Sequence, residues 1–295
     1  MNLLVTGASG FVGRHVLDRF PSALAIGSEM DLRSSESIER ALDSKSFDAV
    51  IHLAAQSSVP ESFRNPGDTF DINFIGTHRL LTALEKRNFK GRVLFVGSGD
   101  MYGPVSTKDL PIREDRALKP LNPYAVSKVA AEALCYQISQ RGALDIVMAR
   151  PFNHIGPGQS EHFAVSSFAK QMVEIRSGRR DALIQVGNLE TTRDFSDVRD
   201  VVAAYELLLE RGERGEVYNV CSGRERSMQE VFERLQRIAG VQCGFVVNED
   251  RLRPTDSPRV RGSAEKIAER TGWMAEIDFD QSLQDLIKDW ENRLR

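Results

Sequence analysis

The chain has few cysteines, little net charge and no long apolar run. Its 295 residues include three cysteines, Cys135, Cys221 and Cys243, whose spacing fits neither a disulfide framework nor a CxxC motif. These predict buried thiols in a reduced compartment. Because no run of about 18 apolar residues occurs, the sequence predicts no membrane span. A net charge of -3 argues against binding of nucleic acid through a general basic field.

Targeting and metal-binding signals are absent as well. The first seven residues enter an apolar segment directly, without the charged region and cleavage site of a secretory signal. We therefore expect a cytoplasmic protein. The five histidines, at positions 15, 52, 78, 154 and 162, show neither a ligand spacing shared with cysteines nor an HExxH helix. We expect no metal site.

Short apolar runs alternate with helical patterns through the first 150 residues. Continuous apolar runs, typical of strands buried on both faces, lie at 2–6, 24–26, 49–53, 92–96 and 145–149. Helical patterns lie at 11–20, 34–42 (with Ser35 as the expected N-cap), 70–84 and 124–138. This alternation predicts an α/β fold, a Rossmann-like doubly wound parallel sheet over residues 1–150 that binds a dinucleotide.

The pattern loosens after Pro151. Helices are predicted at 162–177, 198–211, 227–239, 264–271 and 280–292, strands at 183–186 and 217–220, and an irregular stretch at 248–262. We expect residues 151–295 to form mainly a smaller α/β lobe that binds substrate, with some segments returning to the first domain.

A glycine-rich turn follows the first strand. Gly7, Gly10 and Gly13 form GxxGxxG between that strand and a helix. Gly7 allows a tight turn, Gly10 lets backbone amides approach a pyrophosphate, and Gly13 lets the helix sit close to the sheet. The helix N-terminus, at Phe11 and Val12, supplies N–H groups and partial positive charge. An ordinary glycine-rich turn is the alternative, but the position favours a dinucleotide site.

The choice between NAD and NADP rests on two side chains. Glu29, near the end of the second strand, is placed to hold the ribose of NAD(H). Arg14, at the start of the first helix, is placed to meet the 2′-phosphate of NADP(H), or is simply solvated. The sequence slightly favours NADP(H) and leaves NAD(H) open.

Tyr124 and Lys128 form a YxxxK pattern on one helix face, since they are four residues apart. Asn122 suits the N-cap of this helix and Pro123 its first position. A nearby ammonium, together with an oxidised nicotinamide, is expected to lower the pKa of the phenol, so that it exchanges a proton with a sugar oxygen. Ser98, after an apolar strand, would hold the same oxygen. The alternatives are a surface Tyr/Lys pair and a serine in a turn.

These three motifs together resemble the extended short-chain dehydrogenase/reductase family, over nearly the whole chain. Within it the sequence is similar to the branch of GDP-mannose 4,6-dehydratases and GDP-6-deoxy-D-mannose reductases. The segments that carry the likeness are HLAAQSSV at 52–59, NFIGT at 73–77, NPY at 122–124, RPFNHIGPGQ at 150–159, GNL at 187–189, RDF at 193–195 and TGW at 271–273.

The resemblance implies a ketone reductase of nucleotide sugars, closest to the enzymes that reduce C4 of GDP-4-dehydro-6-deoxy-D-mannose to GDP-D-rhamnose. It implies that Ser98, Tyr124 and Lys128 are catalytic. It implies cofactor contacts at Gly7, Gly10, Phe11, Val12, Gly13, Asp31, Leu32, Leu53, Ala54, Ala55, Tyr124 and Lys128, and contacts to the GDP-sugar at Ser98, Gly99, Asp100, Asn153, Arg193, Arg253 and Asp256. For each arginine a surface ion pair is the alternative.

Positions 98–100 separate the reductases from the dehydratases of this branch. Dehydratases carry Thr-Asp-Glu or Thr-Ser-Glu there, and the glutamate removes the C5 proton while water leaves C6. This chain has Ser98-Gly99-Asp100. Gly99 carries no acid, and Asp100 is one methylene shorter than glutamate, which misplaces a proton-transfer group. Elimination is therefore expected to be disabled, and the role of Asp100 is left open.

Two other classes of function remain alternatives. A GDP-mannose 4,6-dehydratase or a nucleotide-sugar 4-epimerase would retain its cofactor through the cycle. A non-catalytic dinucleotide sensor would keep the fold without turnover, although the intact Ser98, Tyr124 and Lys128 argue against it. The helices at 70–84 and 124–138 carry apolar residues on more than one side, and in this family they pair across a dimer, so a homodimer is expected.

Overall fold

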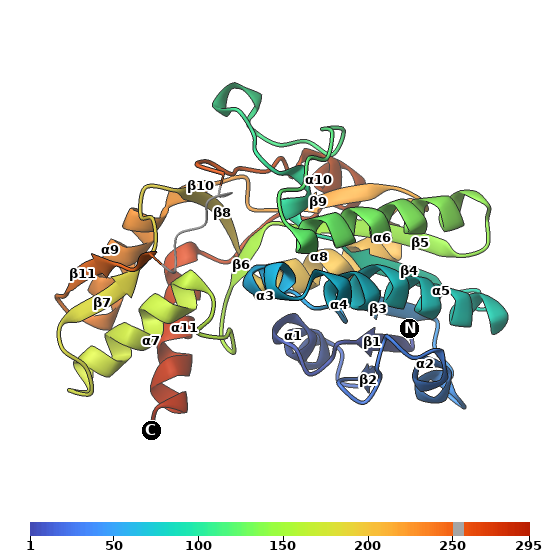
Figure 1. The fold of residues 1–295 in the computed structure, drawn as a ribbon, viewed down its shortest axis with the longest axis horizontal. Coiled ribbons are helices and arrows are strands. Elements are labelled where there is room, and N and C mark those ends of the chain that lie inside the picture. Colours follow the sequence, from blue (N-terminus) through green and yellow to red (C-terminus); the bar gives the residue numbers. More distant parts are fainter. Residues whose placement is uncertain (250–256) are drawn as a thin grey trace.

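A six-stranded parallel sheet forms the larger lobe of the computed structural model, which describes residues 1–249 and 257–295 (Figure 1). The strand order is β2-β1-β3-β4-β5-β9. Their bounds are β1 Leu3–Thr6, β2 Leu24–Ile26, β3 Ala49–His52, β4 Arg92–Val96, β5 Asp145–Pro151 and β9 Val217–Val220. The predicted Rossmann-like α/β fold is confirmed.

Helices cover both faces of this sheet, because alternate residues of each strand point to opposite sides. Leu3, Val5, Ile51 and Leu94 pack on one side against α1 (Phe11–Arg19), α8 (Val198–Arg211) and α10 (Glu265–Thr271). The intervening residues, such as Leu4 and Val50, pack on the other side against α2 (Ser35–Leu42), α5 (Gly76–Lys86) and α6 (Pro123–Gln140). Burial on both faces is why these strands are continuous apolar runs in the sequence.

The order in which successive strands are added to the sheet reverses at β1. Strand β2 pairs with one edge of β1, and β3 pairs with the other edge, with Thr6 opposite His52. In open parallel sheets the carboxyl ends of the strands on either side of such a switch point form the ligand crevice. The turns that follow β1 and β3 therefore lie where a dinucleotide binds.

The smaller lobe is built around two short sheets, β10-β8-β6 and β11-β7 (Figure 1). The strands are β6 (Asn153–Ile155), β7 (Leu183–Val186), β8 (Thr192–Asp197), β10 (Glu225–Ser227) and β11 (Gly244–Val247). Helices α7 (Ala164–Arg176), α9 (Met228–Ala239) and α11 (Phe279–Arg293) enclose its apolar core. Between these elements the chain returns to the larger sheet through α8, β9 and α10.

Several local expectations differ from the structure. Helix α2 is capped by Ser34, whose side chain accepts from the Ser37 N–H, rather than by Ser35. The predicted helix at 70–84 is divided into α4 (Pro66–Phe70), a π-helical turn over Asp71–Ile75, and α5. The sequence also missed β6, β8, β10, β11, α3 (Val59–Arg64) and two 3-10 turns, Gly99–Tyr102 and Thr107–Asp109. Within the described residues, no helix combines the length and apolarity needed to cross a bilayer.

A buried ion pair joins α6 to β5. Arg150 donates from Nη2 to Glu132 Oε1 at 2.6 Å and from Nε to Oε2 at 2.9 Å. The same guanidinium donates from Nη1 to the Tyr102 hydroxyl at 2.7 Å, and that hydroxyl donates to Asn219 Oδ1. The network therefore links the turn after β4, β5, α6 and β9 through charges that water does not reach.

We predict that Glu132→Gln destabilises the protein by about 3–5 kcal/mol, because it leaves the Arg150 guanidinium buried without its counter-charge. Lys86→Met is the control, since the Lys86–Glu39 pair is exposed on the surface and its loss costs less than about 1 kcal/mol. Urea unfolding followed by circular dichroism measures both. Equal small effects would show that the buried pair does not hold these elements together.

Candidate active site

The glycine turn brings β1, α1 and the end of β3 into backbone contact. Gly7 has φ +72°, and a Cβ there would lie 2.7 Å from the backbone nitrogen of Ala54. A Cβ on Gly13 would lie 2.4 Å from the carbonyl oxygen of Gly7. The Leu53 N–H also donates to the Thr6 carbonyl at 3.2 Å. The expected cofactor residues Leu53, Ala54 and Ala55 thus follow β3 directly beside the glycine turn.

The N-terminus of α1 has the donor set that a pyrophosphate needs. Its N-cap is Gly10, no side chain caps it, and its first turn holds no acidic residue. The first N–H groups of a helix have no partner within the helix, so those of Phe11, Val12 and Gly13 are available to an anion. The close backbone approach of Gly7 and Gly13 fits a dinucleotide as well.

Among the side chains expected near the adenosine half, Arg14 lies on α1, whereas Glu29, Asp31 and Leu32 follow β2. Glu29 accepts from the Gly27 N–H at 2.8 Å, and Arg14 donates from Nε to the Ser9 carbonyl at 3.2 Å. Asp31 is held by Arg33, with Oδ1 2.9 Å from Nε, which lowers the pKa of that carboxyl. Leu32 is buried. Arg14 therefore borders the glycine turn, whereas Glu29 is folded back onto the end of β2.

Ser98, Tyr124 and Lys128 meet at the carboxyl end of β4. Helix α6 starts as expected: Asn122 is its N-cap, accepting from the Ala125 N–H at 2.7 Å, and Pro123 is its first residue. The Ser98 hydroxyl is hydrogen-bonded to the Tyr124 phenol. Lys128 is 5% exposed and donates from Nζ to the Val96 carbonyl at 2.8 Å. The arrangement places a hydroxyl and a phenol side by side, with a buried ammonium one helical turn away.

The electrostatics of Tyr124 differ from the sequence expectation. Burial raises the pKa of the phenol, and the nearby carboxylate of Asp100 raises it further, while the hydrogen bond from Ser98 opposes both. Lys128 was expected to lower it, but its ammonium is turned to the Val96 carbonyl. In this structure Tyr124 is therefore a protonated phenol, the state that donates a proton.

Burial also lowers the pKa of two basic side chains beside the site, Lys128 and His52. It lowers the pKa of Lys128 to about 8, so this ammonium is easier to deprotonate than an exposed lysine. Burial and the charge of Lys128 lower the pKa of His52 to about 3. The neutral imidazole of His52 lies between Thr6 and Thr77, at 2.8 and 3.0 Å from their hydroxyls. His52 therefore packs the end of β3.

The expected substrate residues are only partly brought together. Gly99 lies against the Phe152 ring, which a Cβ would approach to 3.3 Å, and Asp100 is exposed in the next turn. Asn153 begins β6 with its side chain exposed, and Arg193 on β8 donates to the Ser257 carbonyl at 2.9 Å. Arg253 and Asp256 lie outside the described residues.

A contact that sequence reasoning missed joins the two lobes at the glycine turn. The Phe11 ring stacks on His154, with centroids 5.9 Å apart and planes at 7°. His15, on the next turn of α1, lies 2.8 Å through Nε2 from the Pro157 carbonyl. Nothing in the spacing of these residues signals the contact, because residues 11 and 154 meet only in the folded chain. It connects the cofactor helix to the segment that carries Asn153.

Within residues 1–249 and 257–295, no three His, Cys, Asp or Glu side chains are grouped so that they could hold a metal ion.

Comparisons with known proteins agree with this geometry. A family model described as GDP-mannose 4,6 dehydratase matches residues 26–286. The chain belongs to this family of extended short-chain dehydrogenases/reductases. It is 45% identical over 99% of its length to the GDP-6-deoxy-D-mannose reductase of Pseudomonas aeruginosa, of which it covers 98%.

Other relatives and solved structures are also similar to this chain. The chain is 31% identical to the GDP-6-deoxy-D-talose 4-dehydrogenase of Aggregatibacter actinomycetemcomitans, with 90% of each chain covered. Among solved structures, RMD from Pseudomonas aeruginosa complexed with NADPH superimposes with a TM-score of 0.93, at 43% identity, covering 99% of this chain and 100% of that one. The UDP-glucose 4-epimerase of Thermus thermophilus with NAD reaches 0.87, at 26% identity, covering 98% of this chain and 99% of that one. The chain is therefore an NAD(P)-dependent oxidoreductase.

We predict that Gly13→Ala weakens binding of NADPH and destabilises the protein by about 1–3 kcal/mol, because the added Cβ meets backbone atoms that cannot turn aside. The control is Gly67→Ala in α4, where no atom lies within 4 Å of the added carbon. Fluorescence titration of NADPH and thermal unfolding measure the two effects. If Gly13→Ala behaves like Gly67→Ala, α1 does not need its close contact with the glycine turn.

Proposed function

We propose that this enzyme uses reduced NADP to convert the C4 ketone of GDP-4-dehydro-6-deoxy-D-mannose to the alcohol of GDP-6-deoxy-D-mannose, also called GDP-D-rhamnose. The observation that carries the proposal is the hydrogen-bonded Ser98–Tyr124 pair at the carboxyl end of β4, beside buried Lys128. The 45% identity to a GDP-6-deoxy-D-mannose reductase supports the substrate.

The three side chains have complementary parts in this reaction. When bound, the reduced nicotinamide supplies the hydride. Tyr124 donates its proton to the oxygen that gains negative charge, and Ser98 donates a hydrogen bond to the same oxygen. Lys128 holds α6 against β4, and its positive charge would lie near the ribose of a bound cofactor. The raised pKa of Tyr124 suits this direction of reaction, because the phenol keeps its proton until the alkoxide forms.

The 3-10 turn that holds Gly99 and Asp100 disfavours dehydration. An acidic or polar side chain in place of Gly99 would start 3.3 Å from the Phe152 ring, a contact that requires the ring to move. The charge of Asp100 raises the pKa of Tyr124, but this carboxylate is exposed. These residues support simple reduction over the elimination that a dehydratase performs.

NADP(H) is the preferred cofactor in this proposal. Arg14 borders the glycine turn, where a 2′-phosphate would be favoured by its charge, and Glu29 is engaged by the Gly27 N–H. The RMD structure with NADPH supports the same choice. The 4-epimerase structure with NAD keeps NAD(H) as the alternative.

The similarity to one relative supports an alternative product, the C4 epimer. The relative named GDP-6-deoxy-D-talose 4-dehydrogenase, at 31% identity, acts on the C4 epimer of GDP-D-rhamnose. Which epimer forms depends on the face of the ketone that meets the cofactor. The higher identity to the mannose reductase supports GDP-D-rhamnose.

Incubation with the 4-keto sugar and NADPH is expected to consume the cofactor in equal amount and to yield GDP-D-rhamnose. Proton NMR of the purified product, read from the coupling constants at C4, distinguishes it from the 6-deoxytalose epimer. NADH in a parallel reaction is expected to give a lower kcat/KM than NADPH. No turnover by folded enzyme, or conversion of GDP-mannose without added reductant, would contradict the proposed reduction.

Tyr124→Phe is expected to lower kcat about 10²- to 10⁴-fold, because it removes the proton donor and leaves the cofactor contacts in place. Tyr136→Phe, on an exposed tyrosine of the same helix, is the matched control. Steady-state kinetics and NADPH titration measure both variants. A sensor without catalysis would bind NADPH equally in all forms and show no turnover even in the unmodified chain.

A homodimer through α5 and α6 is the proposed assembly. Ile75, just before α5, and Val126 and Tyr136 on α6 are 36%, 40% and 54% exposed, which leaves large apolar side chains in water. Such exposure along adjacent helices is typical of an interface. In the family this pair of helices forms the dimer.

Val126→Glu is expected to convert a dimer to a monomer, because the charge would be buried in the interface. Met274→Glu is the control, since Met274 is 66% exposed and lies outside these helices. Light scattering after size exclusion gives the mass of each species. A monomeric unmodified chain, or a Val126→Glu dimer, would rule out this interface.

A further inference from the structure

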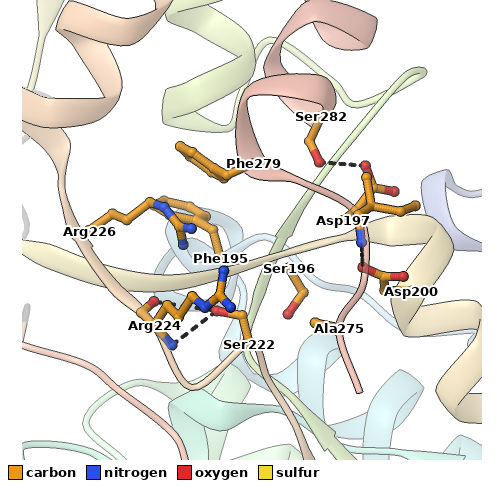
Figure 2. A pocket seen from close by; sticks show the side chains of 11 residues that line it. Phe195, Ser196, Asp197, Asp200, Ser222, Arg224, Arg226, Ala275, Phe279 and Ser282 are labelled. Carbon is orange, nitrogen blue, oxygen red and sulfur yellow. Dashed lines mark hydrogen bonds between the residues drawn. The ribbon is translucent and has the colours of Figure 1, made fainter. Parts of the chain in front are cut away.

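A small pocket of about 20 Å³ lies beside the end of β8 (Figure 2). Its walls come from three separate parts of the chain: the end of β8, the turn at 222–226, and the segment at 275–282 that begins α11. It shares no lining residue with the set assigned above to cofactor, catalysis or sugar. The proposed function therefore leaves this pocket unexplained.

One side of the pocket is formed by a guanidinium without a partner. Arg226 stacks on Phe279, with Cζ 4.2 Å from the ring centroid, which fixes the plane of its donors. Its Nη1 is buried, and no hydrogen-bond partner for it exists among the described residues. Burial lowers the pKa of Arg226, the charge of Glu230 opposes this effect, and the charges of Arg234 and Arg224 add to it. A buried charged donor without an acceptor is costly, so an acceptor is expected.

Two more donors face the same space. The Ser196 hydroxyl is buried in a residue that is 3% exposed, and within the described part of the chain it has no partner either. Arg224 extends into the pocket from the same side as Arg226 (Figure 2). No described carboxylate lies within 4.0 Å of the Arg224 guanidinium nitrogens. The pocket thus gathers two guanidinium groups and one hydroxyl.

The carboxylates that also line the pocket are already engaged. Asp197 accepts from Arg199 Nη2 at 2.7 Å and from the Ser282 hydroxyl at 2.6 Å. Asp200 Oδ2 accepts from the N–H groups of Glu276 and Ile277 at 3.1 and 3.0 Å. Neither carboxylate is hydrogen-bonded to Arg224 or Arg226, so the unpartnered Nη1 of Arg226 is left for an external acceptor.

We propose that this pocket binds a phosphate group, either as inorganic phosphate or on a small phosphomonoester. Two guanidinium groups from the 222–226 turn and one hydroxyl from β8 supply the donors, which suits a tetrahedral anion with several acceptor oxygens better than a planar carboxylate with two. Guanidinium groups are the usual partners of phosphate, because they offer paired donors.

A phosphate bound here would connect β8, the 222–226 turn and the start of α11. It would stabilise the folded protein by mass action, since the three segments are assembled only in the native state. The site therefore has a readout that does not depend on catalysis.

Isothermal titration with inorganic phosphate and, separately, with glycerol 3-phosphate tests the proposal. The unmodified chain is compared with Arg226→Gln, Ser196→Ala, Arg193→Gln and Arg237→Gln. Arg193→Gln controls for the proposed sugar-diphosphate site, and Arg237→Gln removes an exposed arginine of α9. Arg226→Gln is expected to weaken binding about tenfold or more, because a charged hydrogen bond is lost.

Ser196→Ala is expected to weaken binding by a smaller factor, while both controls bind as the unmodified chain does. Thermal unfolding without phosphate shows whether each variant folds, and the rise in Tm on adding phosphate should disappear in Arg226→Gln alone among the arginine variants. Binding of either probe supports the proposal, and their relative affinities identify the source of the phosphate.

Three results would overturn the proposal. The first is that neither probe binds in the millimolar range. The second is that folded Arg226→Gln and Ser196→Ala bind as tightly as the unmodified chain. The third is that binding is lost in Arg193→Gln and kept in Arg226→Gln, which would place the anion in the diphosphate site.

Discussion

The hydrogen bond from Lys128 Nζ to the Val96 carbonyl is the contact on which the active site depends. It joins α6 to the last residue of β4, and Ser98 follows two residues later. Tyr124 lies one helical turn before Lys128 on the same face. Once the ammonium is seated, the helix cannot slide along the sheet, and the phenol is held against the Ser98 hydroxyl. The buried Arg150–Glu132 pair holds α6 to β5 in the same way.

Burial sets the chemistry of this site as well as its geometry. It disfavours the charged form of both groups, keeping Tyr124 a protonated phenol and making Lys128 easier to deprotonate. Asp100 adds negative charge near the phenol. The sequence pattern of Tyr124 and Lys128 alone predicts a lowered pKa for the tyrosine, whereas the structure raises it. The direction of the ammonium and the position of Asp100, which cause the difference, appear only in the folded chain.

The parts of the fold that sequence could predict are those with strong local signals. Strands such as β1 and β3 are continuous apolar runs because both of their faces are covered, and the glycine turn has a spacing that close backbone packing requires. Strands β6, β8 and β10 were missed because they carry polar residues, such as Asn153, Arg193 and Arg226, and pair with strands that are distant in the sequence. The Phe11–His154 stack and the pocket beside β8 were missed for the same reason.

An isotopic label gives the most direct measurement of hydride transfer at this site. NADPH that carries deuterium at the transferable position is incubated with the 4-keto sugar, and the product is examined by NMR and mass spectrometry. If Tyr124 and Ser98 hold a ketone oxygen beside the cofactor, one deuterium appears at C4 of the sugar and the hydroxyl proton comes from solvent. A product without deuterium, or with deuterium at another carbon, would contradict this reaction at this site.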